Sequence, residues 1–239
     1  MNNSAYYLSI PNLLLIFIPV VVVLAIYIKW SLGFKTLLYA TGRMVVQLIL
    51  VGYALIVIFN QSDVLVSGCV LIMMMLVASW IALRPIKQLR KKYYLKTLLS
   101  LVLGSVPVLA LVIIVVVQLT PWHLPRYLIP LAGMIFANGM NSVSLCAERF
   151  HSELNQGKTY FQARNIAYKT GLLPLINSFF AVGLVSIPGM MTGQILAGVS
   201  PLLAVRYQIM VMCMLLGSCG ISSAIFLYLM KNEKTTLTE

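Results

Sequence analysis

The chain has 239 residues, of which 61% are hydrophobic and 9% are charged, and its mean hydropathy is +0.96. Soluble domains carry roughly a quarter charged residues and about half apolar ones, so a water-soluble globule of this length could not bury so much apolar surface. The composition therefore excludes a soluble protein and indicates an integral membrane protein. Membrane topology and contact with anionic lipid headgroups explain the formal net charge of +12, so we expect lipid partners and no nucleic acid.

Seven apolar runs are long enough, at about 17–25 residues each, to cross a bilayer as helices. We therefore predict an all-α, polytopic fold in which residues 1–239 form a single transmembrane domain. The second run is short and is expected to begin inside Phe34–Arg43, and the sixth contains Pro188, which bends or breaks it. The runs are Pro11–Ile28, Met44–Phe59, Val64–Leu83, Leu98–Leu119, Tyr127–Ala147, Leu172–Gly198 and Tyr207–Met230.

Basic residues concentrate in cytoplasmic loops, and this rule predicts the orientation of the chain in the membrane. With seven spans and the N-terminus outside, fifteen of the seventeen Lys and Arg residues fall on the inner side, and Arg126 and Arg206 fall outside. If Ala181–Arg206 instead re-enters the membrane, fourteen fall inside and three outside, so the charges favour seven spans. We predict an outside N-terminus, a cytoplasmic C-terminus and two cytoplasmic loops, at residues 84–96 and 148–171.

The sequence lacks the chemical signatures of three classes of protein. The only Gly-Lys pair, Gly157-Lys158, has no glycine five residues earlier, so the chain has no P-loop and does not hydrolyse ATP by itself. The five acidic residues lie in predicted loops, at span ends or in the tail, whereas an ion-coupled carrier usually keeps one inside the membrane. No HExxH or GxSxG motif and no nucleophile with its base occurs, so we expect no enzyme and no catalytic residues.

What remains is a multispan protein with a polar but uncharged interior and two basic cytoplasmic loops. A transport permease driven by a separate ATPase fits these absences, and so does a membrane scaffold or assembly protein that transports nothing. A secondary carrier is a third alternative. The four cysteines have no metal-ligand spacing, so the residues by themselves assign no metal ligands and no cofactor.

Uncharged polar side chains mark a candidate substrate path in the second and fifth runs. Gln47 is expected to face the helix bundle one turn inside Arg43. In the fifth run Met134, Asn138 and Asn141 share one helix face, because residues three and four apart are neighbours. Asparagine is costly against lipid, so this stripe either forms interhelical hydrogen bonds or lines a path for substrate.

The sixth run contains the segment AVGLVSIPGMMTGQILAG, residues 181–198, in which five residues are Gly or Pro. These are the weakest helix formers, so we predict a broken helix over residues 172–198 with a hinge at Pro188 and Gly189. The methionines that follow serve either packing or the substrate path, and thioethers suit copper(I) better than ferrous iron. On the second alternative the path includes the next turn, Met190, Met191 and Gln194.

Three stretches together resemble the FetB-type family of ABC permeases, which is associated with iron export. They are VGLVSIPGMMTGQILAG with the SP, YQ and IMV that follow it, GRMVVQLILVGY in the second run, and IPLAGMIFANGM in the fifth. The resemblance implies a homodimer of permeases, joined to two cytoplasmic ATPase subunits, that exports iron or a related metal ion across the bacterial plasma membrane. ATP and Mg²⁺ would be bound by the ATPase, and no cofactor by this chain.

Plant relatives of this family are linked to aluminium tolerance and to nucleotide-sugar export, so a non-metal substrate is an alternative. The chain also departs from the family pattern. An aspartate and, three residues on, a lysine are replaced by Asn177 and Phe180, and a glycine in the fifth run is replaced by Ala137. Residues three apart face one another on a helix, so the two lost charges are expected to form a pair in the family. Asn177 stays on the predicted substrate path.

The cytoplasmic segment from Glu148 to Pro174 loosely resembles the loop by which ABC permeases insert a short helix into a groove of the ATPase. Thr159 is suited to cap a helix that starts after it, and Gly171 to end it. A loop that only lies on the membrane surface is the alternative. The predicted coupling residues are Gly157, Thr159, Tyr160, Ala163 and Ala167, of which the last three share one helix face.

Overall fold

The computed structural model describes residues 9–59 and 63–231. Over these ranges the chain is helical apart from its connections, and the extended pairing it contains is a single isolated bridge between Val182 and Ser186. The all-α prediction is therefore confirmed. The chain divides into two compact units, residues 1–61 and residues 62–239. That both belong to a single transmembrane domain stays a prediction.

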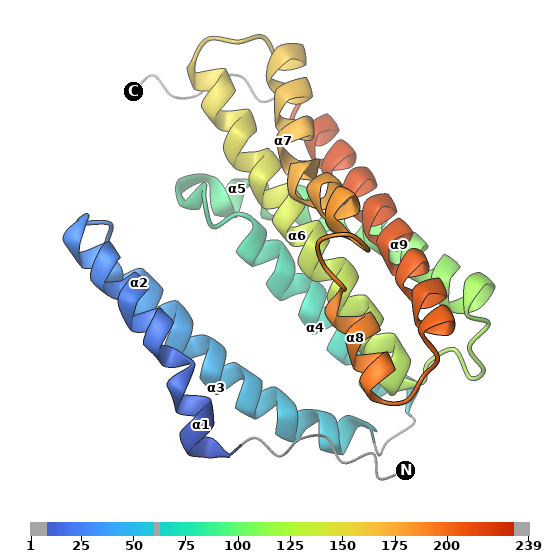
Figure 1. The fold of residues 1–239 in the computed structure, drawn as a ribbon. Coiled ribbons are helices and arrows are strands. Elements are labelled where there is room, and N and C mark those ends of the chain that lie inside the picture. The colour runs from blue at the N-terminus through green and yellow to red at the C-terminus, as the bar shows by residue number, and fades with distance from the viewer. Residues whose placement is uncertain (1–8, 60–62, 232–239) are drawn as a thin grey trace. The chain divides into compact units, whose positions relative to one another are not determined.

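The first unit holds α1 (Ile10–Leu15), α2 (Phe17–Lys29) and α3 (Phe34–Phe59) (Figure 1). Ser9 precedes α1, and its side chain accepts a hydrogen bond from the Asn12 amide, which satisfies one free N–H group of the first turn. No residue of these three helices is buried within the chain. These three helices thus do not bury one another's apolar side chains, and this surface is left for lipid or other helices to cover.

The second unit is a bundle in which most helices begin at a capping side chain or a proline. Asp63 accepts a hydrogen bond from the Leu65 amide at 2.9 Å and so caps the first helix, and Ser200 caps the last one. The elements are α4 (Val64–Ala82), the 3-10 turn η1 (Lys87–Leu89), α5 (Arg90–Ala110), the π-helical turn η2 (Leu111–Val116), α6 (Pro125–Asn155), α7 (Tyr160–Ala181), α8 (Gly189–Leu196) and α9 (Pro201–Leu229).

Six helical stretches in the described ranges are long and apolar enough to cross a membrane. They match six of the seven predicted runs, and the second begins at Phe34, inside the segment expected for it. The remaining run, Leu172–Gly198, contains the end of α7, a break at residues 182–188 and the short α8. Seven crossings therefore stay a prediction. The six stretches are Ile10–Lys29, Phe34–Phe59, Val64–Ala82, Lys87–Val116, Pro125–Asn155 and Pro201–Leu229.

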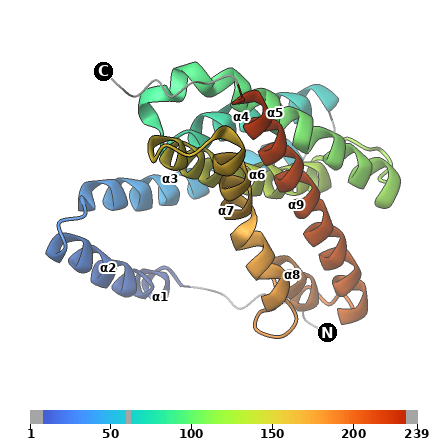
Figure 2. The same ribbon diagram turned by 90° about the horizontal axis from the view of Figure 1, so that it is seen from above.

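The broken pair of α7 and α8 runs antiparallel to α9. At the start of α7 the Tyr160 hydroxyl donates to the Leu227 carbonyl, 2.9 Å away, near the end of α9. Beyond the break, Met191 of α8 and Val205 near the start of α9 line the same cavity. Figures 1 and 2 show the three helices side by side. Together α7 and α8 thus follow the length of α9.

Small residues let the helices of the second unit approach one another closely. Gly104 of α5 lies so near Ser222 of α9 that a Cβ on this glycine would sit 2.7 Å from the Ser222 Cα. Gly171 of α7 lies against α6, where such a Cβ would be 2.8 Å from the Ser142 carbonyl oxygen. Contacts between small residues are typical of membrane helices, because lipid is as apolar as the helix surfaces and packing must hold them together.

Buried serine hydroxyls form hydrogen bonds across these close contacts. Ser105 and Ser218 join α5 to α9 with their oxygens 2.9 Å apart. Ser142 donates to the Gly171 carbonyl at 3.0 Å, and its oxygen lies 2.8 Å from that of Ser223. Since Ser142 has a single hydrogen, Ser223 donates the second bond. Such bonds stabilise a membrane bundle by about 0.6 kcal/mol each on average.

Gly104→Ala should lower the thermal unfolding midpoint of the purified protein, because the added methyl group must push against the Ser222 backbone. Overpacking of this kind costs about 1–3 kcal/mol. Gly68→Ala in α4 is the matched control, since nothing outside its own helix lies within 4 Å of a Cβ there. Equal midpoints for the two variants in the same detergent would contradict the close packing of α5 on α9.

Candidate functional site

The break between α7 and α8 is built from residues that end one helix and begin the next. α7 ends at Ala181, and Gly183 then adopts a φ of +84°, a backbone region that glycine enters without steric cost. The Gly183 amide donates to the Ser186 carbonyl at 3.0 Å, which closes a small loop. Pro188 is extended and directly precedes α8. The break is therefore a folded loop of seven residues, 182–188.

Pro188 and Gly189, the predicted hinge, lie where the loop ends and α8 begins. Pro188 has a φ of −62° and a ψ of 146°, so it starts α8, as the fixed φ of proline favours. The Thr192 hydroxyl donates to the Pro188 carbonyl at 3.2 Å. The chain leaves helical geometry already at Val182. Any bending of this segment thus involves the loop of residues 182–188 and not a single kink.

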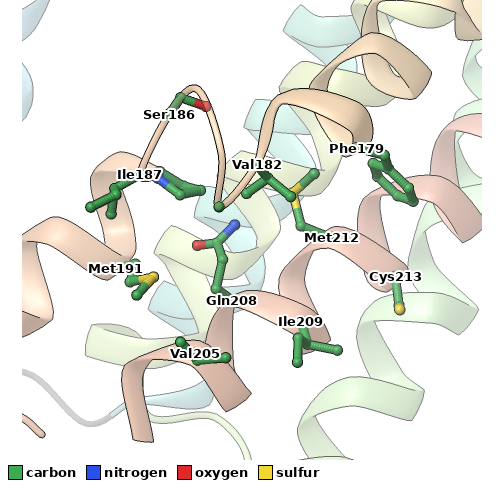
Figure 3. Close-up of a pocket in the computed structure, with 12 residues that line it drawn as sticks. Phe179, Val182, Ser186, Ile187, Met191, Val205, Gln208, Ile209, Met212 and Cys213 are labelled. Atoms are coloured by element: carbon green, nitrogen blue, oxygen red, sulfur yellow. The ribbon is translucent and has the colours of Figure 1, made fainter. Parts of the chain in front are cut away.

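A cavity of about 560 Å³ lies between this loop and α9. Its lining is apolar except for a few groups, among them the buried amide of Gln208. Figure 3 shows Gln208 projecting from α9 towards the loop that carries Val182 and Ile187. In the part of the chain that the structure describes, no three His, Cys, Asp or Glu side chains are grouped to hold a metal ion.

The predicted path residues of this segment differ in their surroundings. Met191 lines the cavity, whereas Met190 packs, half-buried, against the hydrophobic core. Gln194 is half-buried, and its Oε1 has no hydrogen-bond partner among the residues that the structure describes. Asn177 is exposed on α7. Of these four, Met191 is the one that faces the cavity.

The predicted stripe on α6 does not line this cavity. The Asn138 side chain donates to the Met134 carbonyl of its own helix at 2.9 Å, and Asn138 is not among the residues that line the cavity. Asn141 lines another cavity, of about 380 Å³, together with Arg84. Gln47 is exposed on α3, in the first unit. The predicted path residues of the second unit therefore do not form one site.

Basic side chains gather where α5 begins and α6 ends, which is also the end where α7 begins and α9 finishes (Figure 1). There Tyr93 of α5 stacks on His151 of α6 with 5.4 Å between ring centroids, and the ammonium groups of Lys92 and Lys96 lie over the Tyr93 ring. Eleven of the thirteen Lys and Arg residues at positions 63–231 lie at this end or on the helix turns that lead from it, namely Arg84, Lys87, Arg90, Lys91, Lys92, Lys96, Arg149, Lys158, Arg164, Lys169 and Lys231.

A buried carboxylate holds the turn from α6 to α7. The Glu153 side chain is fully buried and forms ion pairs with Arg149 and Lys158. Between them Gly157 adopts a φ of +82°, which lets the chain reverse direction after α6. A carboxylate without these cations would be expensive to bury, so the pairs fix the geometry of the turn.

The predicted coupling face points into the bundle. Ala163 and Ala167 are fully buried in the core of the second unit, and the Tyr160 hydroxyl is held by α9. The helix also continues past Gly171 to Ala181, because this glycine serves the contact with α6 and does not end α7. Ala163 and Ala167 are therefore unavailable as a docking surface for another protein.

The outward face of the same turn is exposed and can contact another protein. Thr159 caps α7, as predicted, and exchanges side chain–backbone hydrogen bonds with Gln162 in a capping box. Next to it Phe161 is 59% exposed, and the Arg164 guanidinium lies 5.3 Å from the centre of its ring. An exposed aromatic side chain next to a fixed turn is a feature of protein interaction sites.

Comparisons with known proteins identify the family. Residues 10–234 match the uncharacterised protein family UPF0014. The chain belongs to this family. A UPF0014 membrane protein of Synechocystis is 40% identical over 195 residues, 75% of each chain. The probable iron export permease protein FetB of Escherichia coli is 34% identical over 234 residues, 91% of this chain and 89% of the relative. Protein ALUMINUM SENSITIVE 3 of Arabidopsis thaliana is 32% identical over 231 residues, 88% and 82% of the two chains. No solved structure matches.

The UPF0014 chain is thus a multi-pass membrane protein with a permease relative, and its resemblance to FetB-type permeases is confirmed. Asn177 and Phe180, which replace the charged residues of the resembled pattern, are both exposed on α7. Because neither is buried, the loss of the two charges leaves no partner charge stranded in the bundle.

Sequence reasoning missed two residues of this UPF0014 chain that the structure makes prominent. Gln208 has a visible signal, because an amide inside the apolar α9 resembles Gln47, which was selected for the same reason. Glu153 was counted among the loop carboxylates, although its spacing from Arg149 is that of an i,i+4 ion pair. Its complete burial depends on how α6 and α7 pack.

Gly183→Ala should destabilise the UPF0014 protein by about 1 kcal/mol, because alanine pays a steric cost at positive φ. Gly193→Ala in α8 should have the opposite sign, since alanine favours a helix interior by up to about 1 kcal/mol over glycine. Neither added methyl group meets an atom within 4 Å, so the comparison isolates the backbone. Thermal unfolding in one detergent measures both, and a shift of the same sign would contradict the loop geometry.

Proposed function

We propose that this chain is the transmembrane permease subunit of an ATP-driven exporter that moves iron or a related metal ion outward across a bacterial plasma membrane. The observation that carries the proposal is its 34% identity, over 91% of the chain, to a probable iron export permease protein. The sequence has no P-loop, so ATP and Mg²⁺ are assigned to a separate cytoplasmic ATPase subunit. A second copy of the chain completes the permease, and the unburied helices of the first unit offer surface for it.

The proposed topology has seven crossings, an outside N-terminus and a cytoplasmic C-terminus. Two features of the second unit support it. First, α7 and α8 follow α9 along its length, as a crossing segment must. Second, basic residues gather at one end of the bundle, and Arg126 and Arg206 lie towards the other, which matches the positive-inside rule.

The loop of residues 182–188 is the element proposed to move during transport. Its side chains Leu184 and Val185 are 90% and 84% exposed, so few contacts hold the loop in place. Alternating access requires an element that changes shape between two rigid parts, and this loop connects α7 to α8. Met191 and Gln194 lie in α8, which follows the loop. The substrate path predicted at this point is part of the proposal.

The ATPase is proposed to dock on the turn between α6 and α7, at the exposed Phe161 and the neighbouring Gly157. This turn lies at the basic end of the bundle, the end assigned to the cytoplasm. Its shape is fixed from inside by the Glu153 ion pairs and by the Thr159 capping box. A rigid turn of this kind transmits force between subunits better than a mobile loop, because little of the motion is absorbed locally.

ATP-driven export is tested in vesicles that contain this chain and its ATPase. ATP should drive iron across the membrane, and an uncoupler that collapses the proton gradient should leave the rate largely intact. An ATPase whose P-loop lysine is replaced is the control and should abolish transport. Iron movement by this chain alone, driven by a pH gradient, would make it a secondary carrier. Transport of a nucleotide sugar and not of iron would make the nucleotide sugar the substrate. No transport at all would favour the membrane scaffold.

Phe161→Asp should weaken binding of the ATPase by about tenfold or more, because a charge replaces an exposed aromatic contact. Trp122→Asp is the matched control, since Trp122 is 50% exposed in the loop before α6, at the other end of the bundle. Pull-down of the ATPase with each purified variant gives the comparison. Ala163→Asp is unsuitable, because that residue is fully buried and its change would disrupt the bundle. Equal binding by both variants would exclude this turn as the main contact.

A further inference from the structure

The Gln208 side chain of α9 is buried without a complete set of hydrogen bonds. It is 7% exposed, and its Oε1 has no partner among the residues that the structure describes. A buried acceptor without a partner costs about 1–3 kcal/mol relative to one that is paired. The cost is not relieved inside a membrane, because the hydrocarbon supplies no donor. The unpaired Oε1 therefore indicates that a group outside the described residues donates a hydrogen bond to it.

The Gln208 side chain lies in the wall of a half-open cavity. Gln208 lines the cavity of about 560 Å³ between α9 and the loop of residues 182–188. Figure 3 shows its amide between the loop on one side and Val205 and Ile209 of its own helix on the other. The volume lies within the range of small-molecule sites, about 300–1,000 Å³.

The remaining walls of the cavity define what can enter it. They are apolar apart from the Ser186 hydroxyl and the Cys213 thiol, and they contain no Asp, Glu, Lys, Arg or His side chain. A bare divalent cation would lose its water there without gaining charged ligands, so the cavity does not suit the proposed metal substrate. The lining favours an uncharged molecule with an apolar body and one polar group placed to meet Gln208.

The route into the cavity is from the apolar exterior of the helices. Ile187 of the loop and Ile209 of α9 both line it and are 62% and 59% exposed. In a membrane these exposed apolar residues face acyl chains, so the molecules that reach the cavity are those dissolved in the bilayer.

We propose that this cavity binds an uncharged, single-chain lipid that carries a free hydroxyl group, with the hydroxyl donating to Gln208 Oε1 and the chain packing between α9 and the loop. This proposal does not depend on metal transport, although Met191 and the loop of residues 182–188 take part in both proposals. A lipid seated here touches both α9 and the loop of residues 182–188, so its binding should also raise the thermal unfolding midpoint.

The test compares dodecanol with dodecyl methyl ether, which has the same apolar chain but no donor. Purified protein in lipid nanodiscs is labelled with a long-chain alcohol that bears a photoactivatable diazirine, and each probe competes for the labelling. Dodecanol should compete about tenfold better than the ether, the ratio expected for one buried hydrogen bond. Labelled peptides should map to residues 205–213 or 182–188.

Gln208→Met removes the acceptor at nearly constant volume and should abolish the preference for the alcohol. Ile209→Ala is the matched control: it removes apolar wall and should weaken both probes while leaving their ratio unchanged. Equal competition by alcohol and ether in the unsubstituted protein would overturn the proposal. A preference that survives in Gln208→Met, labelling outside the cavity, or a cross-link from position 208 to a second copy that excludes both probes would overturn it as well.

Discussion

The hydrocarbon interior of a membrane offers no hydrogen-bond partner, and the second unit is organised by that constraint. Every polar group placed inside must find its partner in the protein, and helices must be held by packing since lipid gives no hydrophobic drive between them. Gly104, Gly171 and the serines beside them meet both demands at once. The two glycines bring α5, α6, α7 and α9 into close contact. Ser105 pairs with Ser218 and Ser142 with Ser223 between these helices, whereas the Ser222 hydroxyl next to Gly104 has no partner among the described residues.

The loop of residues 182–188 contrasts with that packed bundle. There the backbone leaves the helix, large apolar side chains are exposed, and Gln208 keeps an acceptor without a partner. A protein tolerates non-helical backbone at membrane depth only where protein or another molecule covers it. Both proposals depend on this non-helical segment. The permease proposal uses motion of the loop, and the lipid site uses the cavity between the loop and α9.

The opposite end of the bundle follows a different rule, because it meets water and charged headgroups. Glu153 is buried there, but with two cations beside it, and the basic residues around Tyr93 and His151 lie at the surface where they can be solvated. The chain thus separates a charged, rigid end, suited to a protein partner, from an apolar and less constrained region around α8.

Composition and the length of the apolar runs determined the membrane class, the all-α fold and six of the helices. The family was indicated by the resemblance of the Pro-Gly-Met-Met block and two other stretches, which are also local properties of the chain. Neither kind of observation could say which face of a helix turns inward. Ala163 was expected at an interface with a partner and is buried in the chain, while Asn138 bonds within its own helix. Tertiary packing decided these positions, together with the burial of Glu153 and Gln208, because a helix with apolar residues on all sides carries no record of which neighbour it will meet.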